Sequence, residues 1–505
     1  MVPIDYKKIS VLFVGFLVVE LLSFWALSWP MLNYIAVAVI LAIALAASLY
    51  RLEYGLLIVA GELFIGSLGH LFQFNIGSTA VTIRVALWLI VMSAFLLKFI
   101  AQIVKYRRQS LYWSRWRNFF SGHLLAGGKL FWLLFLFIVI GLINGWARGH
   151  ALTTIFLDFN AWLYFLLLFP IVAVYGEREA GRIKRLQTLF FAAAFCLSLK
   201  TLFLLYIFTH NLGVADVFYV WLRRTLVGEM TPTLSGWPRI FIQGQIFSAL
   251  AFLMVFWLRQ FDRVRWQFRD FFQTRNMVAL LIAGLFFSSI LISFSRSFWV
   301  GFLAAAGASL ILLWRRTSFL KTVRAGGWLI LAGGLGFLLI YLTAVFPYPR
   351  AGGFSADFEE RISNQNEAAL ASRWSLLPVL GEEIKKEPWF GQGFGATVTY
   401  FSRDPRILEN NPSGEYTTYA FEWGYLDIWL KLGCLGLLAY LWLLFRLSLS
   451  AWRQGVRHND YLFFSLIAGI IFLAVTNIFT PYLNHPLGIG FLLFSSCLIW
   501  PDRVY

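Results

Sequence analysis

Apolar runs of about 20 residues recur along this chain, and they limit the solvent in which it can fold. As a helix, such a run crosses the hydrocarbon core of a bilayer with its backbone groups hydrogen-bonded internally. Candidate spans start near residues 9, 31, 54, 79, 129, 154, 188, 243, 277, 298, 326, 424, 462 and 486. Polar residues interrupt the runs near 54 and 154, namely Glu62, His70, Asp158 and Asn160. We expect an all-α polytopic integral membrane protein with about 12–14 transmembrane helices.

The charged residues indicate how these spans are oriented. Only 13% of residues are charged, and the net charge is +17. The basic residues lie in short segments between apolar runs, which argues against nucleic acid as a partner. They fall in alternate connections, near residues 7–8, 51, 105–117, 178–185, 259–275, 315–324, 446–457 and 503. The positive-inside rule then places the N-terminus in the cytoplasm.

Segments outside the spans carry further expectations. The first apolar run has no small-residue cleavage site before it ends, so we expect an uncleaved first span. Segments 105–128 and 259–275 are basic with interleaved Trp and Phe, which favours a position along the inner membrane surface. Two outer segments are long, from about 209 to 242 and from about 347 to 421. The second is the most polar stretch of the chain, and its length indicates a function.

The sequence offers no motif for a metal or a nucleotide. Cys196, Cys434 and Cys497 lie in apolar runs without metal or disulfide spacing. The outer segments contain no DxD, and the chain contains no HExxH and no P-loop. The GQGFG segment lacks the strand and helix that surround a dinucleotide site. We therefore expect neither a metal nor another cofactor.

Two arginines run against the positive-inside bias. Arg296 lies in SFSRSFWVG, an outward turn between two apolar runs, and Arg239 lies in GWPRIFIQGQ at the outer end of another span. An arginine near the membrane centre costs about 2.5–3.5 kcal/mol on insertion scales, so a partner is expected even at the boundary. Phosphate is a natural partner, because guanidinium pairs with it bidentately. In the alternative interpretation, Arg296 anchors the turn to headgroups or helix C-termini, and Arg239 snorkels to the interface.

Four segments, in this order, resemble the bacterial O-antigen ligase and polysaccharide polymerase family. They are GWPRIFIQGQIFSALAFL with Arg239 and Gly244, SFSRSFWVGF with Ser295–Arg296, ASRWSLLPVLGEEIKKEPWFGQGFG (371–395) and EWGYLDIWLKLGCLG (422–436). In the third, Arg373 leads a short helix that ends in a Pro- and Gly-rich turn. In the fourth, Gly433 and Gly436 match the family's Gly-x-x-Gly, but Glu422 and Trp423 replace its His and following Asn, Ser or Gln. This difference weakens a ligase assignment relative to a polymerase or a divergent ligase.

A second segment is similar to the family's histidine motif but lies in the wrong place. HNDYL at 458–462 follows Gly433 and Gly436 and falls on the cytoplasmic side by charge. We interpret it as the ordinary start of a helix that Asn459 or Asp460 caps.

The resemblance implies a GT-C-like fold and an activity. Members of this family transfer a glycan from undecaprenyl diphosphate to an acceptor hydroxyl at the outer face of the bacterial inner membrane, without a metal. The acceptor is lipid A–core for a ligase and another lipid-linked glycan for a polymerase, and membrane lipids and polysaccharide assembly proteins are further candidate partners. Arg296 and Arg373 would then neutralise the diphosphate, and Glu422 would accept the acceptor's proton or orient its hydroxyl. The expected substrate-binding residues are Arg239, Arg361, Gly393, Tyr425 and Asp427.

Simpler roles stay open for these residues. Arg373 would pair with Glu382, Glu383 or Glu367 on the loop surface, and Glu422 would be a solvated carboxylate at a helix start. Hydrogen bonding inside the bundle, rather than catalysis, is expected for Glu62, Asp158 and Asp427.

The domain organisation follows the resemblance. We expect N-terminal transmembrane helices over 1–234, a ligase-like core with its outer loop 347–421 over 235–440, and C-terminal transmembrane helices over 441–505. The competing functions are a lipid-linked oligosaccharide flippase or polysaccharide transporter, and a scaffold that recruits assembly enzymes. The absence of a visible internal repeat disfavours a transporter.

Overall fold

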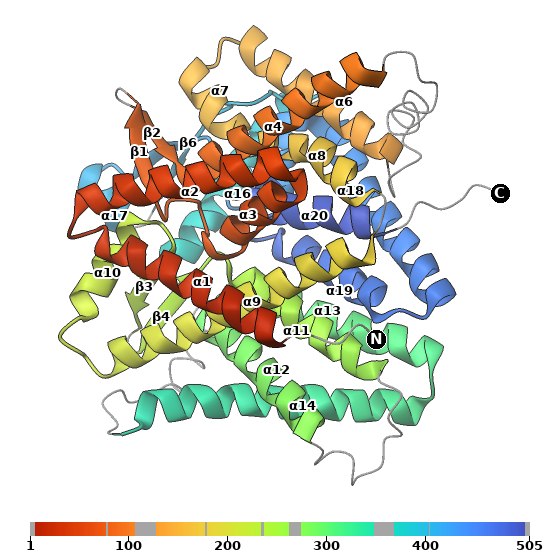
Figure 1. The fold of residues 1–505 in the computed structure, drawn as a ribbon. Coiled ribbons are helices and arrows are strands. Elements are labelled where there is room, and N and C mark those ends of the chain that lie inside the picture. The colour runs from red at the N-terminus through yellow and green to blue at the C-terminus, as the bar shows by residue number, and fades with distance from the viewer. Residues whose placement is uncertain are drawn as a thin grey trace. The chain divides into compact units, whose positions relative to one another are not determined.

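The computed structural model describes residues 6–76, 79–106, 128–176, 179–233, 237–261, 274–347, 368–402 and 405–499. The segments that we expect along the inner surface, and Arg361, lie largely or wholly outside these residues. Figure 1 labels the helices and strands along the chain. The chain divides into two units. Unit 1 comprises Met1–Ser110, Leu167–Phe358 and Gln454–Phe472, and unit 2 comprises Leu111–Leu166, Glu359–Arg453 and Leu473–Tyr505.

Helices form nearly all of the regular structure. Through α14 they are α1 (Tyr6–Trp25), α2 (Pro30–Tyr50), α3 (Leu52–Ile65), α4 (Ile83–Tyr106), α6 (Gly128–Ala147), α7 (Leu152–Phe159), η1 (Trp162–Leu167), α8 (Leu168–Tyr175), α9 (Ala180–Thr209), α10 (Ala215–Arg224), α11 (Gln245–Gln260), α12 (Thr274–Ile292), α13 (Arg296–Arg316) and α14 (Phe319–Val345). The remainder are α16 (Ala368–Lys386), α17 (Pro405–Asn410), α18 (Gly424–His458), α19 (Tyr461–Thr476) and α20 (Pro486–Leu498). An all-α polytopic membrane protein is therefore the observed fold class.

Each span start expected from the sequence corresponds to a helix, but fewer helices have the length of a full span. Among the described residues, eight helices are long and apolar enough to cross a membrane, and a bent pair formed by α7 with Trp162–Tyr175 adds a ninth. The starts near 243, 277, 462 and 486 belong to shorter apolar helices, and the start near 54 belongs to the 14-residue α3. The number of full-length spans is therefore lower than the expected 12–14, because several of the expected spans form helices that are too short.

Local chemistry sets several helix boundaries. Pro30 and Pro486 occupy first-turn positions, where a missing N–H costs nothing. The Ser318 side chain accepts a hydrogen bond from the Lys321 N–H at the start of α14. Arg51 is extended, with φ −142° and ψ 122°, and separates α2 from α3.

Three two-stranded antiparallel hairpins, which the sequence did not predict, lie in the connections. They pair β1 (Gln73–Ile76) with β2 (Thr79–Thr82), β3 (Gly228–Pro232) with β4 (Pro238–Ile242), and β5 (Val398–Phe401) with β6 (Glu415–Thr418). The span expected near 79 accordingly begins only at Ile83, because β2 occupies the preceding residues. All three hairpins fall in segments that the charge pattern assigns to the outer side.

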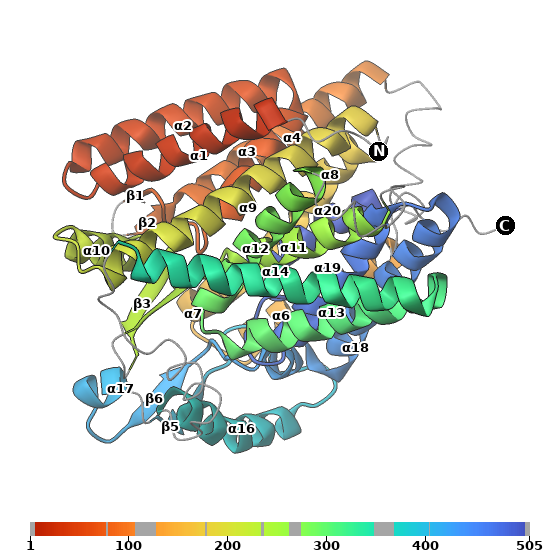
Figure 2. The same ribbon diagram turned by 90° about the horizontal axis from the view of Figure 1, so that it is seen from below.

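In unit 1, α9 runs between α1 and α3 on one side and α11 and α12 on the other (Figure 2). Buried ion pairs join α9 to α1 and α4 to α3. Lys200 Nζ lies 2.6 Å from Glu20 Oε1, and Arg84 Nε lies 2.9 Å from Glu62 Oε2. The expected role of Glu62 inside the bundle is thereby confirmed. Residues such as Ile330, with 76% of its surface exposed, face outward as lipid-contacting residues do.

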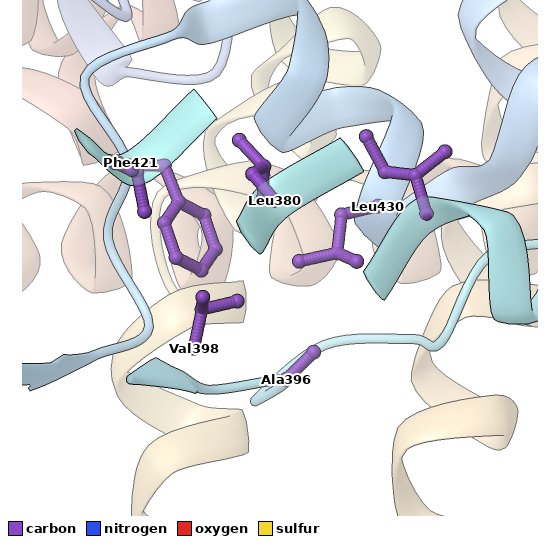
Figure 3. Close-up of a cluster of buried hydrophobic side chains, with 7 residues drawn as sticks. Leu380, Ala396, Val398, Phe421 and Leu430 are labelled. Carbon is purple, nitrogen blue, oxygen red and sulfur yellow. The ribbon is translucent and has the colours of Figure 1, made fainter. Parts of the chain in front are cut away.

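In unit 2, α16 packs against β5 and the beginning of α18. Leu376, Leu380 and Ile384 of α16 form a buried cluster with Val398, Phe421 and other apolar side chains (Figure 3). Partly buried Trp423 and Trp429 pack against the same cluster. This packing fixes α16, and the Arg373 that it carries, on the segment that leads into α18.

Candidate functional site

The turn that carries Arg296 is tied by serines. α12 ends at Ile292 and α13 begins at Arg296, so the expected turn between two apolar helices is observed. Phe294 adopts a positive φ of 47°, and the Ser295 N–H donates to Ser293 Oγ at 3.1 Å. Arg296 is half-buried at the first residue of α13, the helix end that carries a positive partial charge. A negative group placed there gains from both the side chain and the helix.

Arg239 reaches the same turn from β4. Its Nε donates to the Ser293 backbone oxygen at 3.2 Å, and its guanidinium lies 5.5 Å from the centre of the Phe241 ring. The pairing of β4 with β3, Arg239 opposite Thr231, holds the strand that positions it. The structure thus brings Arg239 to the turn that begins with Ser293 and leads to Arg296, all within unit 1.

In unit 2, Arg373 and Glu422 form an ion pair between α16 and the segment before α18. The side chains are 37% and 51% exposed, so solvent or a ligand can reach both. Trp423 Nε1 donates to the Arg373 backbone oxygen at 3.0 Å, which ties the same two segments together. The structure therefore joins two residues that we predicted separately as catalytic.

Two of the glutamates considered as alternative partners of Arg373 pair with lysines instead. Glu382 and Glu383 accept from Lys385 and Lys386, each at 2.6 Å, and Glu367 lies outside the described residues. The surface pairing expected with Glu382 or Glu383 is therefore wrong. Burial would raise the pKa of Glu383, but hydrogen bonds from Gln392 and Lys386 outweigh it and lower that pKa below its ordinary value.

The Gly-rich turn after α16 packs on α6. Gly391, Gly393 and Gly395 have positive φ values of 71°, 88° and 80°, which favour glycine. A Cβ on Gly393 would lie 2.1 Å from the Gly145 nitrogen, and the Phe394 N–H donates to the Gly141 oxygen at 3.0 Å. In this structure, Gly393 allows the close approach of the turn to α6.

The same turn fills a break in α18. Gly433 has φ 74° and ψ 173°, so the helix is interrupted there. The Gln392 N–H donates to the Leu430 oxygen at 2.7 Å, and the Cys434 N–H donates to the Pro388 oxygen at 2.8 Å. The backbone groups released by the break are thus hydrogen-bonded by segment 388–392, as the membrane interior demands. A Cβ on Gly433 would lie 2.1 Å from the Trp389 oxygen.

A cluster of buried charged side chains contacts this turn. We did not predict this cluster from the sequence. Lys431 Nζ lies 2.5 Å from Asp158 Oδ1 and 2.5 Å from Asp427 Oδ1. Asp158 Oδ2 accepts from the Gly395 N–H at 2.9 Å, and Asp427 Oδ2 accepts from the Asn484 side chain. The bundle-internal role expected for Asp158 and Asp427 is confirmed. The available sequence signal was the i, i+4 spacing of Asp427 and Lys431 within an apolar run.

The remaining candidates are also placed by backbone contacts. The Tyr425 hydroxyl donates to the Ala474 oxygen at 2.6 Å. In HNDYL, Asp460 Oδ1 accepts from the Leu462 N–H at 3.0 Å, and Asn459 Oδ1 accepts from Arg316 at 3.3 Å. The interpretation of that segment as a capped helix start is confirmed. Within the described ranges, His, Cys, Asp and Glu form no group of three or more able to hold a metal ion.

Residues 278–441 match the family described as O-antigen ligase. This part of the chain is therefore similar to the O-antigen ligase family. The matched region includes Arg296, Arg373, Glu422 and the glycine of the α18 break, whereas Arg239 and HNDYL lie outside it. A search of curated proteins finds no match to the chain.

Proposed function

We propose that this O-antigen ligase-like protein transfers a glycan from undecaprenyl diphosphate to an acceptor hydroxyl at the outer face of the bacterial inner membrane. The acceptor is lipid A–core or a second lipid-linked glycan. The observation that carries the proposal is the family match over residues 278–441, which contains Arg296, Arg373 and Glu422. The multi-pass helical fold supports a substrate anchored in the same membrane.

Contacts within unit 1 support the sidedness that the charge pattern predicts. Arg185, at the start of α9, pairs at 2.6 Å with Glu53, next to the α2–α3 connection, and both segments are assigned to the cytoplasmic side. On the assigned outer side, Ser23 Oγ donates to the Leu71 oxygen at 2.7 Å, and Asn33 Nδ2 donates to the Gln73 oxygen at 2.7 Å. Connections assigned to one side thus contact each other.

In unit 2, the exposed Arg373–Glu422 pair can carry the proton-transfer step. A diphosphate carries more negative charge than a carboxylate and offers bidentate oxygens, so it competes for the Arg373 guanidinium and releases Glu422. Glu422 then accepts the proton of the acceptor hydroxyl while the oxygen of that hydroxyl bonds to the anomeric carbon of the donor sugar. The bond from that carbon to the phosphate oxygen breaks, and undecaprenyl diphosphate leaves with the electron pair. Arg373 stabilises the negative charge that develops on it.

In unit 1, Arg296 and Arg239 supply positive charge at the Ser293–Arg296 turn. A phosphate there would meet a guanidinium at a helix N-terminus, with Arg239 as a second donor. Fixed guanidinium groups would replace the charge of a divalent metal, so we expect transfer to persist in EDTA.

The test uses purified protein in lipid nanodiscs with a defined undecaprenyl diphosphate oligosaccharide, and products are resolved on gels. Arg373→Ala should lower the transfer rate about 10²–10³-fold, the loss typical of one charge-stabilising contact. Arg223→Ala is the matched control, because the Arg223–Glu229 pair is 42% and 48% exposed and lies outside the matched region. Equal activity of both variants would refute the assignment of Arg373.

The products also identify the acceptor class. A ladder formed from the donor alone indicates a polymerase, whereas a single shifted band that requires lipid A–core indicates a ligase. If neither product forms and the protein instead moves labelled lipid-linked glycan across vesicle membranes, the transferase proposal is wrong and a flippase takes its place.

A further inference from the structure

Three aromatic side chains of unit 2 form a surface beside the Arg373–Glu422 pair. We call Trp374, Trp423 and Phe479 the aromatic platform. The Trp374 and Trp423 ring centres are 5.7 Å apart at an interplanar angle of 64°, and those of Trp423 and Phe479 are 5.7 Å apart. Trp374 is 57% exposed and Phe479 is 37% exposed, so much of this apolar surface faces outward.

The packing and the hydrogen bond of Trp423 fix the position of the platform. Trp423 packs against the buried cluster that includes Leu380 and Phe421, and its indole N–H donates to the Arg373 backbone oxygen. Each indole is the chain neighbour of one member of the ion pair, Trp374 of Arg373 and Trp423 of Glu422. The geometry therefore places exposed aromatic rings, tilted against one another, next to a charged pair.

We propose that the aromatic platform binds a sugar ring of the glycan substrate, an inference that rests on the proposed glycan transfer. A pyranose ring has an apolar C–H face, which packs on an indole, and hydroxyls at its rim, which bond to a carboxylate or guanidinium. Acyl chains match the aromatic part only, because they offer no polar group to the Arg373–Glu422 pair beside it. A sugar next to Glu422 is placed where an acceptor hydroxyl must lose its proton.

Equilibrium binding tests this inference without turnover. The probe is the oligosaccharide released by mild acid from the lipid-linked glycan pool of the source cells, labelled at its reducing end. Binding to the full-length protein in nanodiscs is followed by fluorescence anisotropy. Trp374→Ala should raise the dissociation constant about three- to tenfold, as expected for the loss of one aromatic contact. Trp374→Phe keeps a flat ring and should stay within about twofold of the unaltered protein.

Trp442→Ala is the matched control, because Trp442 is 53% exposed but lies within α18, on its apolar stretch. It should bind the probe as the unaltered protein does. Equal affinities of Trp374→Ala and Trp442→Ala would overturn the sugar site and leave Trp374 a membrane-surface residue. Absence of binding by the unaltered protein would overturn it as well. Neither result decides glycan transfer, which the Arg373→Ala assay tests separately.

Discussion

Replacing Lys431 with methionine removes the ammonium that two buried carboxylates share. The side chains of Lys431, Asp158 and Asp427 are only 3%, 6% and 2% exposed, so water cannot take the place of the cation. Methionine keeps a similar length and apolar stem, so the change is mainly one of charge. The Gly395 and Asn484 donors remain, but they are neutral.

The expected loss of stability follows from the two carboxylates that stay buried after the substitution. Removing one partner of a buried ion pair typically costs about 3–5 kcal/mol, because the other charge is left uncompensated. Here two carboxylates lose their cation at once and face each other across the vacated position. We therefore expect Lys431→Met to lower the free energy of unfolding by about 4–5 kcal/mol.

Reversible unfolding in mixed detergent micelles, followed by circular dichroism, measures this loss. Lys385→Met is the control, because the Lys385–Glu382 pair is 73% and 69% exposed and should contribute about 0–1 kcal/mol. The triple variant Asp158→Asn/Asp427→Asn/Lys431→Met should recover most of the loss, since neutral groups can replace a buried ion cluster at little cost. A Lys431→Met loss no larger than that of Lys385→Met would refute the reasoning.

Three further predictions test other parts of the structure. Gly393→Ala should lower stability by about 2–4 kcal/mol because of its positive φ and the lack of space for a Cβ, whereas Gly326→Ala, with nothing within 4 Å, should raise it slightly; thermal unfolding checks both. Arg239→Ala should raise KM for the lipid-linked donor about tenfold in the transfer assay, and an unchanged KM would contradict a role in phosphate binding. The depressed pKa of folded Glu383 stabilises the protein above the ordinary value of 4.5, and this contribution disappears as the pH falls through the folded value. Glu383→Gln, which keeps the contact with Gln392 possible, should therefore flatten the loss of stability below about pH 4.5.

Most helices could be predicted from the sequence, because an apolar run favours a membrane helix without help from residues far away in the chain. The positions near 54 and 154 were the least regular, and the structure explains both. Glu62 is tolerated in α3 because Arg84, 22 residues later, pairs with it, and Asp158 is tolerated in α7 because Lys431, 273 residues later, does the same. Such pairings depend on how distant helices pack, which periodicity and hydropathy do not report.

The candidate residues could be predicted from the sequence one at a time, but the contacts between them could not. Arg373 and Glu422 were each expected from a resemblance, yet their ion pair joins segments 49 residues apart. The pairing follows from the apolar face of α16, which buries Leu376, Leu380 and Ile384 and thereby fixes Arg373. The Lys431 cluster was missed, because its three members look like isolated polar residues in apolar runs.

The break at Gly433 gives the length of the half-helix that precedes it a structural consequence. Nine residues of helix, 424–432, separate the segment carrying Glu422 from the break where segment 388–392 docks. Each added or deleted residue would turn this half-helix by about 100° and shift it by about 1.5 Å. Lys431 would then turn away from Asp158, and Glu422 would move along α16 past Arg373. The length of the half-helix therefore couples the buried cluster, the glycine turn and the exposed ion pair.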